Sequence, residues 1–140
     1  EYNVRMGDPE CQTILPRLKS DLAVIINSCC NGTLDKTPIE WEDKKSLCVV
    51  LCAKGYPDTF KKGTEIPNLD NILINADNYL FHAGTKKVIN KIIVNGGRVL
   101  NFVSISDDFL SARKKVHKII EKVNWTDGFY RKDIGYKVID

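Results

Sequence analysis

The sequence predicts an α+β fold, and three observations indicate it. Apolar residues recur at helical spacing from Asp8 to Cys30 and again from Asp107 to Val123. Between these segments, residues 47–52 (LCVVLC) form a continuous apolar run, which is typical of a central strand buried on both faces. Short β-branched and apolar stretches bounded by turn residues follow it. We therefore expect a small mixed β-sheet domain with a packing helix, in a chain of 140 residues that suits one domain or one small domain with a piece of another.

The first residues, EYNVRM, alternate in polarity as a strand does. Successive side chains of a strand point to opposite faces, so Glu1, Asn3 and Arg5 share one face. Carboxylate and amide oxygens are hard ligands suited to Mg²⁺, and a guanidinium can grip a phosphate oxygen. The same alternation is typical of any half-exposed strand, so the spacing alone allows either a ligand-binding face or a solvated one.

A helix is expected to follow this strand. Gly7 allows a turn, Asp8 can cap a helix, and Pro9 fits the first helical position. Pro16 lacks an amide hydrogen and should kink the helix or split it in two, and Gly32 ends it. The apolar residues that recur on one face of this predicted helix are Ile14, Leu18, Leu22, Ile25 and Ile26.

The turn-rich segment 31–38 marks the expected boundary between a first unit and a second, smaller one. After it we expect a short strand from Ile39, a charged turn at residues 42–45, and the buried strand at residues 47–52. The further short strands are predicted near residues 72–74, 79–82, 87–94 and 98–104.

The second helix is predicted over residues 107–123, with Ser106 as its cap. Residues 125–140 are expected to be irregular and rich in aromatic side chains. The buried stripe of this helix is expected to contain Leu110, Val116, Ile119, Ile120 and Val123.

Three loops of the second unit contain residue types that can bind a ligand. The 54–57 loop (KGYP) places a cation beside a tight turn, the 81–85 loop (FHAGT) combines an imidazole with small residues, and the 95–98 loop (NGGR) allows close backbone approach. Each also has a plain structural interpretation, as an exposed turn, a structural histidine and a hairpin turn respectively. The candidate binding residues of these loops are Lys54, Tyr56, His82, Gly84, Thr85, Gly96, Gly97 and Arg98.

Composition excludes several classes of protein. The net charge of +3 is too small to indicate nucleic-acid binding, and no basic stretch is interleaved with aromatics. No apolar run reaches membrane-spanning length, and no signal peptide opens the chain. The five cysteines form no C-x-x-C pair, which argues against a zinc site or a disulfide scaffold. Cys48 and Cys52 are expected to share one face of a strand as reduced, packed thiols.

The motifs resemble those of a known family. EYNVRMGDPECQ is similar to the E-x-N-x-R-F-G-D-P-E-x-Q signature of the phosphoribosylamine–glycine ligases, which belong to the ATP-grasp superfamily, with Met6 where that family usually has Phe. The segments PRLKSDL, KGYP, FHAGT, NGGRVL and YRKDIG match in family order. The resemblance spans essentially the whole chain but only the carboxyl-terminal third or so of such a ligase. It implies that residues 1–35 end an ATP-grasp domain, as a strand plus a kinked helix. It also implies that residues 36–140 form a small domain that is rudiment single-hybrid-like.

The resemblance also implies a reaction. Such a ligase joins glycine to 5-phosphoribosylamine with ATP as co-substrate, giving glycinamide ribonucleotide, ADP and phosphate in de novo purine biosynthesis in the cytoplasm. By this resemblance Glu1 and Asn3 would hold Mg²⁺ or Mn²⁺, and Arg5 would be catalytic. Asp8 and Glu10 would orient the amine-bearing substrate, and the three loops would bind the phosphoribosyl group. The resemblance places the family's ATP-binding lysines, its glycine-rich loop and its amino-terminal substrate domain upstream of Glu1. We therefore expect the chain to be inactive alone and to need the amino-terminal remainder of the ligase as its partner.

Two alternatives remain open from the residues. Another ATP-grasp ligase or a biotin-dependent carboxylase shares the E-x-N-x-R strand, although the GDPE continuation and the later loops argue against both. A non-catalytic module that binds a phosphorylated ligand or a partner protein is the alternative from a different class.

Overall fold

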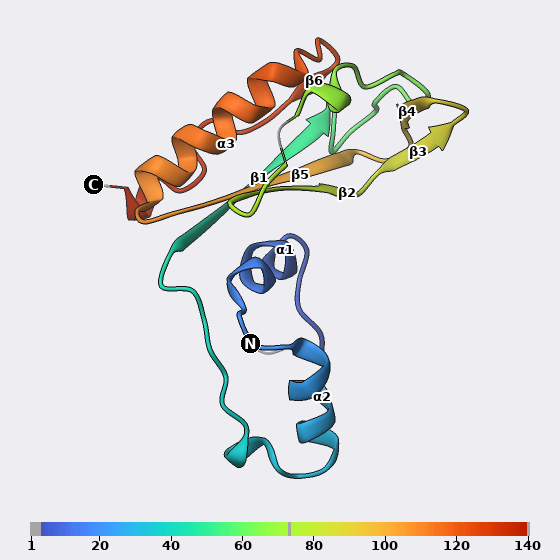
Figure 1. Cartoon of the computed structure of the whole chain (residues 1–140). Helices are drawn as coiled ribbons and strands as arrows, with labels where there is room; N and C mark the ends of the chain where they lie inside the picture. Colours follow the sequence, from blue (N-terminus) through green and yellow to red (C-terminus); the bar gives the residue numbers. More distant parts are fainter. Residues whose placement is uncertain (1–3, 73, 140) are drawn as a thin grey trace.

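The computed structural model of the chain describes residues 4–72 and 74–139. It consists of two parts, one built around a β-sheet and one made of short helices (Figure 1). The sheet and the long helix that packs on it form the first part, which we call the sheet unit (residues 45–72 and 74–139). The first helices lie below the sheet and form the helical unit (residues 4–44). The helices are α1 (Glu10–Ile14), α2 (Leu22–Cys30) and α3 (Phe109–Val123), and the strands are β1 (Lys45–Ala53), β2 (Asn78–His82), β3 (Thr85–Val88), β4 (Lys91–Val94), β5 (Arg98–Ser106) and β6 (Gly128–Phe129). The short 3₁₀ turns cover Leu15–Arg17, Leu34–Lys36, Leu69–Asn71 and Tyr136–Val138.

The centre of the sheet unit is the pair β1 and β5. In the described residues the main sheet has the order β2-β5-β1-β6, and β3 pairs with β4 in a separate hairpin. The α+β class is confirmed, but where a mixed sheet was predicted, these strand pairings are all antiparallel. In register, Val49 faces Phe102 and Leu51 faces Leu100, and all four side chains are buried in the core beneath α3. The apolar run therefore forms an interior strand, as the sequence predicted, but it is not fully buried on both faces, because Cys48 and Val50 are only half-buried.

The other face of β1 is covered only in part. Cys48 and Cys52 share this face, as predicted, together with Val50. Cys52 is buried, whereas Cys48 and Val50 are half-buried beside α1 and the chain after α3. Helix α1 thus lies against the sheet face opposite α3, whereas α2 extends away from the sheet (Figure 1).

Helix α3 differs from the prediction at its start. Its cap is Asp108, whose carboxylate accepts a 2.7 Å hydrogen bond from the Ser111 amide, and not Ser106, which is the last residue of β5. Leu110 was predicted to be buried but is 44% exposed, because it lies about 120° around the helix from the mean direction of the buried stripe. The fully buried residues of α3 are Ala112, Val116, Ile120 and Val123.

The predicted first helix is divided into two. The 3₁₀ turn that contains Pro16 follows α1, and Leu18 is extended and bridges to Trp41, so a new helix begins after Asp21. The split at Pro16 that the sequence predicted is therefore confirmed. The apolar residues expected on one face remain largely exposed, however: Ile14 and Leu22 are each 40% exposed and Ile26 is 54% exposed. The expected short strand from Ile39 is reduced to this single Trp41 bridge.

Five smaller predictions also need correction. Asp8 makes no cap to α1, whose N-cap residue is Pro9, so Pro9 does not occupy the first helical position. Ile72 and Ile74 lie outside the strands that the structure describes. The strand predicted over residues 87–94 is a hairpin, β3 and β4, that turns at Ile89. The aromatic-rich end of the chain contributes the short strand β6.

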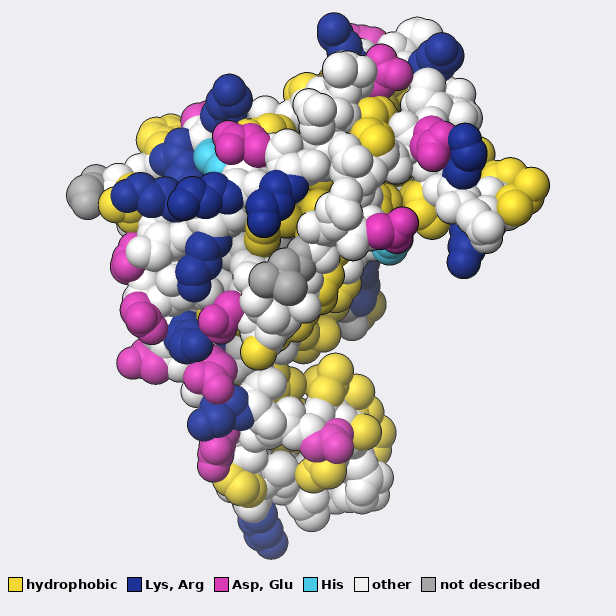
Figure 2. Space-filling view, turned by 45° about the horizontal axis from the view of Figure 1, so that its top comes forward, with side chains coloured by type: hydrophobic (Ala, Val, Ile, Leu, Met, Phe, Trp, Pro, Cys, Tyr) yellow, Lys and Arg dark blue, Asp and Glu magenta, His cyan; other side chains and the backbone are white. Residues whose placement is uncertain are grey.

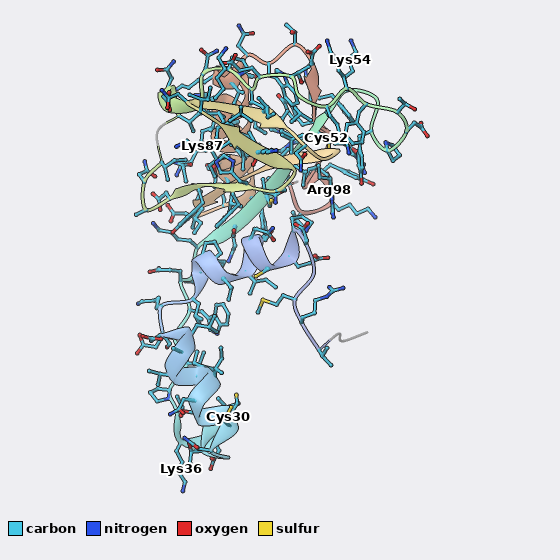
Figure 3. All side chains as sticks on the ribbon, turned by 90° about the vertical axis from the view of Figure 1, so that its right-hand side faces the viewer. Cys30, Lys36, Cys52, Lys54, Lys87 and Arg98 are labelled. Carbon is cyan, nitrogen blue, oxygen red and sulfur yellow. The ribbon has the colours of Figure 1, made fainter. Side chains whose placement is uncertain are left out.

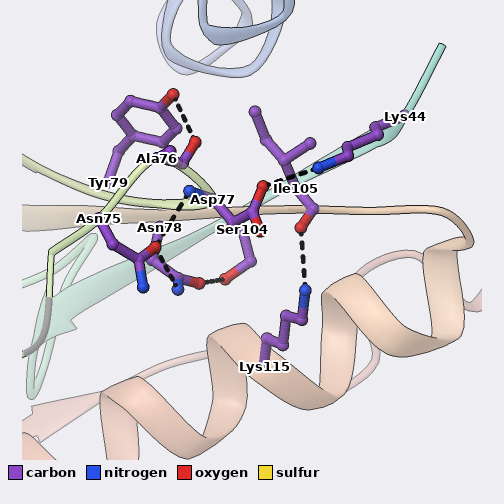
Figure 4. Close-up of polar contacts among 9 residues, drawn as sticks. All are labelled: Lys44, Asn75, Ala76, Asp77, Asn78, Tyr79, Ser104, Ile105 and Lys115. Atoms are coloured by element: carbon purple, nitrogen blue, oxygen red, sulfur yellow. Dashed lines mark hydrogen bonds and ion pairs between the residues drawn. The ribbon is translucent and has the colours of Figure 1, made fainter. Parts of the chain in front are cut away.

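Polar contacts fix the start of β2 (Figure 4). Asn78 accepts a 2.8 Å hydrogen bond from Ser104 on β5 and donates one of 2.9 Å to Asn75. The ammonium of Lys44 lies 3.1 Å from the Asp77 carboxylate, which raises the pKa of Lys44. Since Lys44 ends the helical unit, this ion pair ties the crossing between the two units to β2.

No helix among residues 4–72 and 74–139 is long and apolar enough to cross a bilayer.

Candidate functional site

The 81–85 and 95–98 loops are in direct backbone contact. The amides of Asn95 and Gly96 donate to the Gly84 carbonyl at 2.8 and 2.9 Å. A Cβ atom at Gly84 would lie 2.6 Å from the Gly96 Cα atom, so this approach requires a glycine at position 84. The 95–98 loop is therefore not a hairpin turn: β4 pairs with β3 and β5 pairs with β2.

The 54–57 loop joins the same place. The Ala53 amide donates to the Gly97 carbonyl at 2.8 Å, and the Tyr56 ring lies directly on Gly97. A Cβ atom at Gly97 would lie 2.7 Å from Cε2 of that ring, so a glycine is needed there too. The structure thus brings together the three loops that the sequence singled out, and we call them the loop cluster (residues 54–57, 81–85 and 95–98).

Arg98 connects the loop cluster to the helical unit. Its Nη2 atom lies 3.2 Å from Oδ2 of Asp8, and its Nη1 atom donates to the Asp8 carbonyl oxygen at 3.0 Å. The other carboxylate oxygen of Asp8 accepts a 2.8 Å hydrogen bond from Gln12. The GDPE motif and the NGGR motif, 90 residues apart, therefore meet at one ion pair. Figure 3 labels Arg98, which lies on the side of the sheet that faces α1.

The other predicted side chains are placed less closely. His82 Nδ1 is 2.9 Å from Thr85 Oγ1, so the imidazole is oriented by its own loop. Lys54 is exposed at the end of β1 and, in Figure 3, lies well away from Arg98. Arg5 is exposed and donates to the Met6 carbonyl at 3.2 Å, while the exposed Glu10 carboxylate folds back over Gly7.

The predicted metal ligands Glu1 and Asn3 lie outside the described residues. In the part of the chain that is described, no group of three or more His, Cys, Asp or Glu side chains is placed to hold a metal ion.

A groove of about 640 Å³ separates the N-terminal segment from β2. One wall carries Tyr79 and Phe81, stacked with ring centroids 6.1 Å apart, and the other carries Gln12, whose Oε1 atom is buried without a hydrogen-bond partner among the described atoms. The sequence analysis included Phe81 only as part of the 81–85 loop and assigned no role to Tyr79 or Gln12. The Y-x-F alternation in a strand could have placed both rings on one face. The groove is lined by Met6, Gly7, Asp8, Cys11, Gln12, Leu15, Pro16, Tyr79, Phe81 and His82.

A second, mostly apolar hollow of about 510 Å³ lies over the outer face of β1, between Pro9 and the chain after α3. Burial raises the pKa of the Cys48 thiol on this face to about 12, and it raises the pKa of Cys52 as well. These thiols therefore stay protonated at neutral pH and are unsuited to act as nucleophiles.

Comparison with known proteins gives a consistent result. The family model described as the phosphoribosylglycinamide synthetase C domain matches residues 46–137, more than half of the chain. The phosphoribosylamine–glycine ligase of Fusobacterium nucleatum is 47% identical over 136 residues, which cover 96% of this chain and 32% of that protein. A bifunctional purine biosynthetic protein of Dictyostelium discoideum is 43% identical over 100% of this chain and 17% of its own length.

A solved structure agrees with these relatives. The crystal structure of the phosphoribosylamine–glycine ligase of Thermotoga maritima matches with a TM-score of 0.71 and 34% identity, over 96% of this chain and 32% of that one. The chain thus spans about a third of the length of the single-function ligases that it matches. On these grounds, the chain belongs to the phosphoribosylglycinamide synthetase C-domain family.

Proposed function

We propose that this chain is the carboxyl-terminal part of a phosphoribosylamine–glycine ligase, an ATP-dependent carbon–nitrogen ligase of de novo purine biosynthesis. The complete enzyme joins glycine to 5-phosphoribosylamine and releases glycinamide ribonucleotide, ADP and phosphate. The observation that carries this proposal is the 47% identity to a ligase of that name across 96% of the chain. The amino-terminal remainder of the same cytoplasmic enzyme is its partner. Residues 1–35 end the ATP-grasp domain, and residues 36–140 form the small domain.

The N-terminal segment acts at the phosphoryl group in this proposal. Glu1 and Asn3 would hold Mg²⁺ or Mn²⁺, which offsets charge on the ATP phosphates when it is bound. Arg5 is exposed and uses Nη1 for the Met6 carbonyl, so its other guanidinium donors can bind the transferring phosphoryl oxygens. This arrangement suits the phosphorylation of the glycine carboxylate to an acyl phosphate, which the amine of the sugar then attacks.

The loop cluster holds the phosphoribosyl substrate in this proposal. Glycines at the loop contacts allow the loops to approach one another closely. His82 and Thr85 form a hydrogen-bonded pair at the edge of the groove. Asp8 and Glu10 orient the amine at the start of α1. The residues that we assign to the substrate from the loops are Lys54, Tyr56, His82, Gly84, Thr85, Gly96 and Gly97, with Arg98 at their junction with Asp8.

The test is an ADP-release assay on the complete polypeptide that contains these residues. We expect release that depends on glycine, on 5-phosphoribosylamine and on Mg²⁺, and that falls by about 10²–10³ in Arg5→Ala, because one preorganised donor at a developing charge contributes this much. An Arg131→Lys variant, changed at an exposed ion pair with Asp133 to which no role in the site is assigned, is the control. The chain alone should release no ADP.

Two results would overturn the proposal. ADP release that depends on bicarbonate and biotin would identify a carboxylase instead. Full turnover in Glu1→Gln and Asn3→Ala variants would leave this segment as a non-catalytic binding module.

A further inference from the structure

We propose that Arg98 is a positioning residue. Its guanidinium holds the turn at Asp8, and with it the segment that carries Arg5, in fixed register with the loop cluster. This inference rests on the function proposed above, where Arg5 acts on the phosphoryl group. It assigns to Arg98 a role through Asp8 in place of a direct contact with substrate.

The base of the Arg98 side chain is fixed on both sides. The preceding residue, Gly97, lies beneath the Tyr56 ring, and its carbonyl oxygen accepts a hydrogen bond from the Ala53 amide. The Arg98 carbonyl itself accepts the Gly84 amide at 2.8 Å, and the next residue, Val99, is fully buried. The guanidinium therefore extends from a backbone that each of the other two loops holds in place.

The far end of the side chain makes a two-point contact with a single residue. One guanidinium nitrogen lies 3.2 Å from the Asp8 carboxylate and another donates to the Asp8 carbonyl at 3.0 Å. Because the planar guanidinium binds both the side chain and the main chain of Asp8, it fixes the orientation of the Asp8 peptide as well as its distance from Arg98. A lysine is a point charge on a flexible stem and cannot reproduce this geometry.

Asp8 passes this constraint to both of its neighbours in the chain. Its second carboxylate oxygen accepts from Gln12, which ties the turn to α1. On the other side Asp8 is three residues from Arg5, a reach of about 10 Å at most, so a shift of the turn moves the Arg5 guanidinium. Both oxygens of Asp8 are thus used within the chain.

The ion pair is too exposed to serve mainly as a stabilising contact. The side chains of Arg98 and Asp8 are 44% and 47% exposed, and exposed pairs of this kind contribute little to stability. The geometry instead suits a contact whose value lies in placement, and misplacement of a reacting group by about 1 Å can lower a rate by about 10²-fold.

The first test is hydrogen exchange on the 140-residue chain, which needs no enzymatic activity. The amides of Cys11 and Thr13 donate hydrogen bonds to the carbonyl oxygens of Gly7 and Pro9, on either side of Asp8. In Arg98→Lys we expect these two amides to exchange at least several-fold faster. The matched control is Arg131→Lys, since Arg131 also holds an aspartate, Asp133, by two hydrogen bonds. Unchanged exchange at both amides in Arg98→Lys, with β5 intact, would overturn the proposal.

The second test separates positioning from substrate binding in the complete polypeptide. We expect Arg98→Lys to lower kcat by about 10–100-fold, with the KM for 5-phosphoribosylamine changed less than about twofold. Asp8→Asn should add little to Arg98→Lys, because both changes break the same contact. A large rise in KM with kcat preserved would instead make Arg98 a substrate ligand. If no ligase activity is found in the unaltered polypeptide, the proposed function fails, and the exchange result still decides whether Arg98 positions the turn.

Discussion

The helical unit and the sheet unit are made from similar apolar residues but bury them very differently. In the sheet unit, Val99, Leu100 and Phe102 are completely buried. Among residues 4–44, all described, Ser28 is the sole buried residue, while Val24 and Ile26 are 55% and 54% exposed. Figure 2 shows this difference as hydrophobic atoms spread over the surface of the lower lobe.

The difference indicates which unit can fold by itself. The sheet unit has a core of its own between β1, β5 and α3. Helix α2 has nine residues, and a helix of that length is marginal in water without tertiary packing. The helical unit is attached by its contacts with the sheet, including the Arg98–Asp8 pair, and its exposed apolar side chains are those that the proposed amino-terminal remainder would cover.

The largest expected effect contrasts the two units directly. Phe102→Ala should lower the free energy of unfolding by about 3–5 kcal/mol, because it leaves a cavity in the closed core. Ile26→Ala on α2 should change it by less than about 0.5 kcal/mol. Urea unfolding followed by circular dichroism measures both, and equal losses would remove the contrast.

A second substitution tests the loop cluster. Gly97→Ala should cost about 1–3 kcal/mol in unfolding free energy, because the new methyl group overlaps the Tyr56 ring. The same change made in a Tyr56→Ala background should cost clearly less. If the two backgrounds lose the same amount, the close approach of these loops is not what requires the glycine.

A pH titration tests the start of α3. Hydrogen bonds from Ser111 lower the pKa of Asp108 below its usual 3.8, so its stabilising contribution is present above pH 3.8 and is lost as the pH falls through the lower, folded-state pKa. Asp108→Ala should therefore lower the urea midpoint at neutral pH but much less in strong acid. Ser106→Ala, at the cap that the sequence predicted, should not show this pH dependence.

The smallest effect concerns the thiols, which report on each unit without perturbing it. All five cysteines, each within the described residues, are free. At about pH 8 an alkylating reagent should modify the exposed Cys29 and Cys30 of α2 within minutes and leave Cys48 and Cys52 of β1 unmodified until the chain unfolds. Mass spectrometry of digested samples measures the extent of alkylation at each of these four cysteines. Rapid labelling of Cys48 would contradict the burial described for β1.

The sheet unit was the easier part to predict from the sequence. The apolar run of β1, the β5 strand and the α3 stripe are patterns long enough to identify an element. The β3–β4 turn was missed because Ile89 adopts φ 55° without the glycine that normally marks such a turn. In the helical unit, Pro16 predicted the break between the helices, but the bridge between Leu18 and Trp41 joins residues far apart in the sequence, and no local pattern reveals such a contact.

The candidate site shows the same limit. Each of the three loops was identified from its own residues and from the family resemblance, but their convergence depends on which strands pair, and strand pairing is a tertiary property. The contact between Arg98 and Asp8 was not foreseen for the same reason. Asp8 was expected to cap α1 or orient a substrate; it does not cap α1, and both of its carboxylate oxygens also make contacts within the chain.

The most direct test of this account is hydrogen exchange across α2, measured in the 140-residue chain and in the complete polypeptide. If the remainder of a ligase covers the helical unit, the amides of Ile25 and Ile26 should exchange rapidly in the chain alone and at least about 100-fold more slowly in the complete protein, while the β1 and β5 amides stay protected in both. Equal protection of α2 in the two samples would contradict the account.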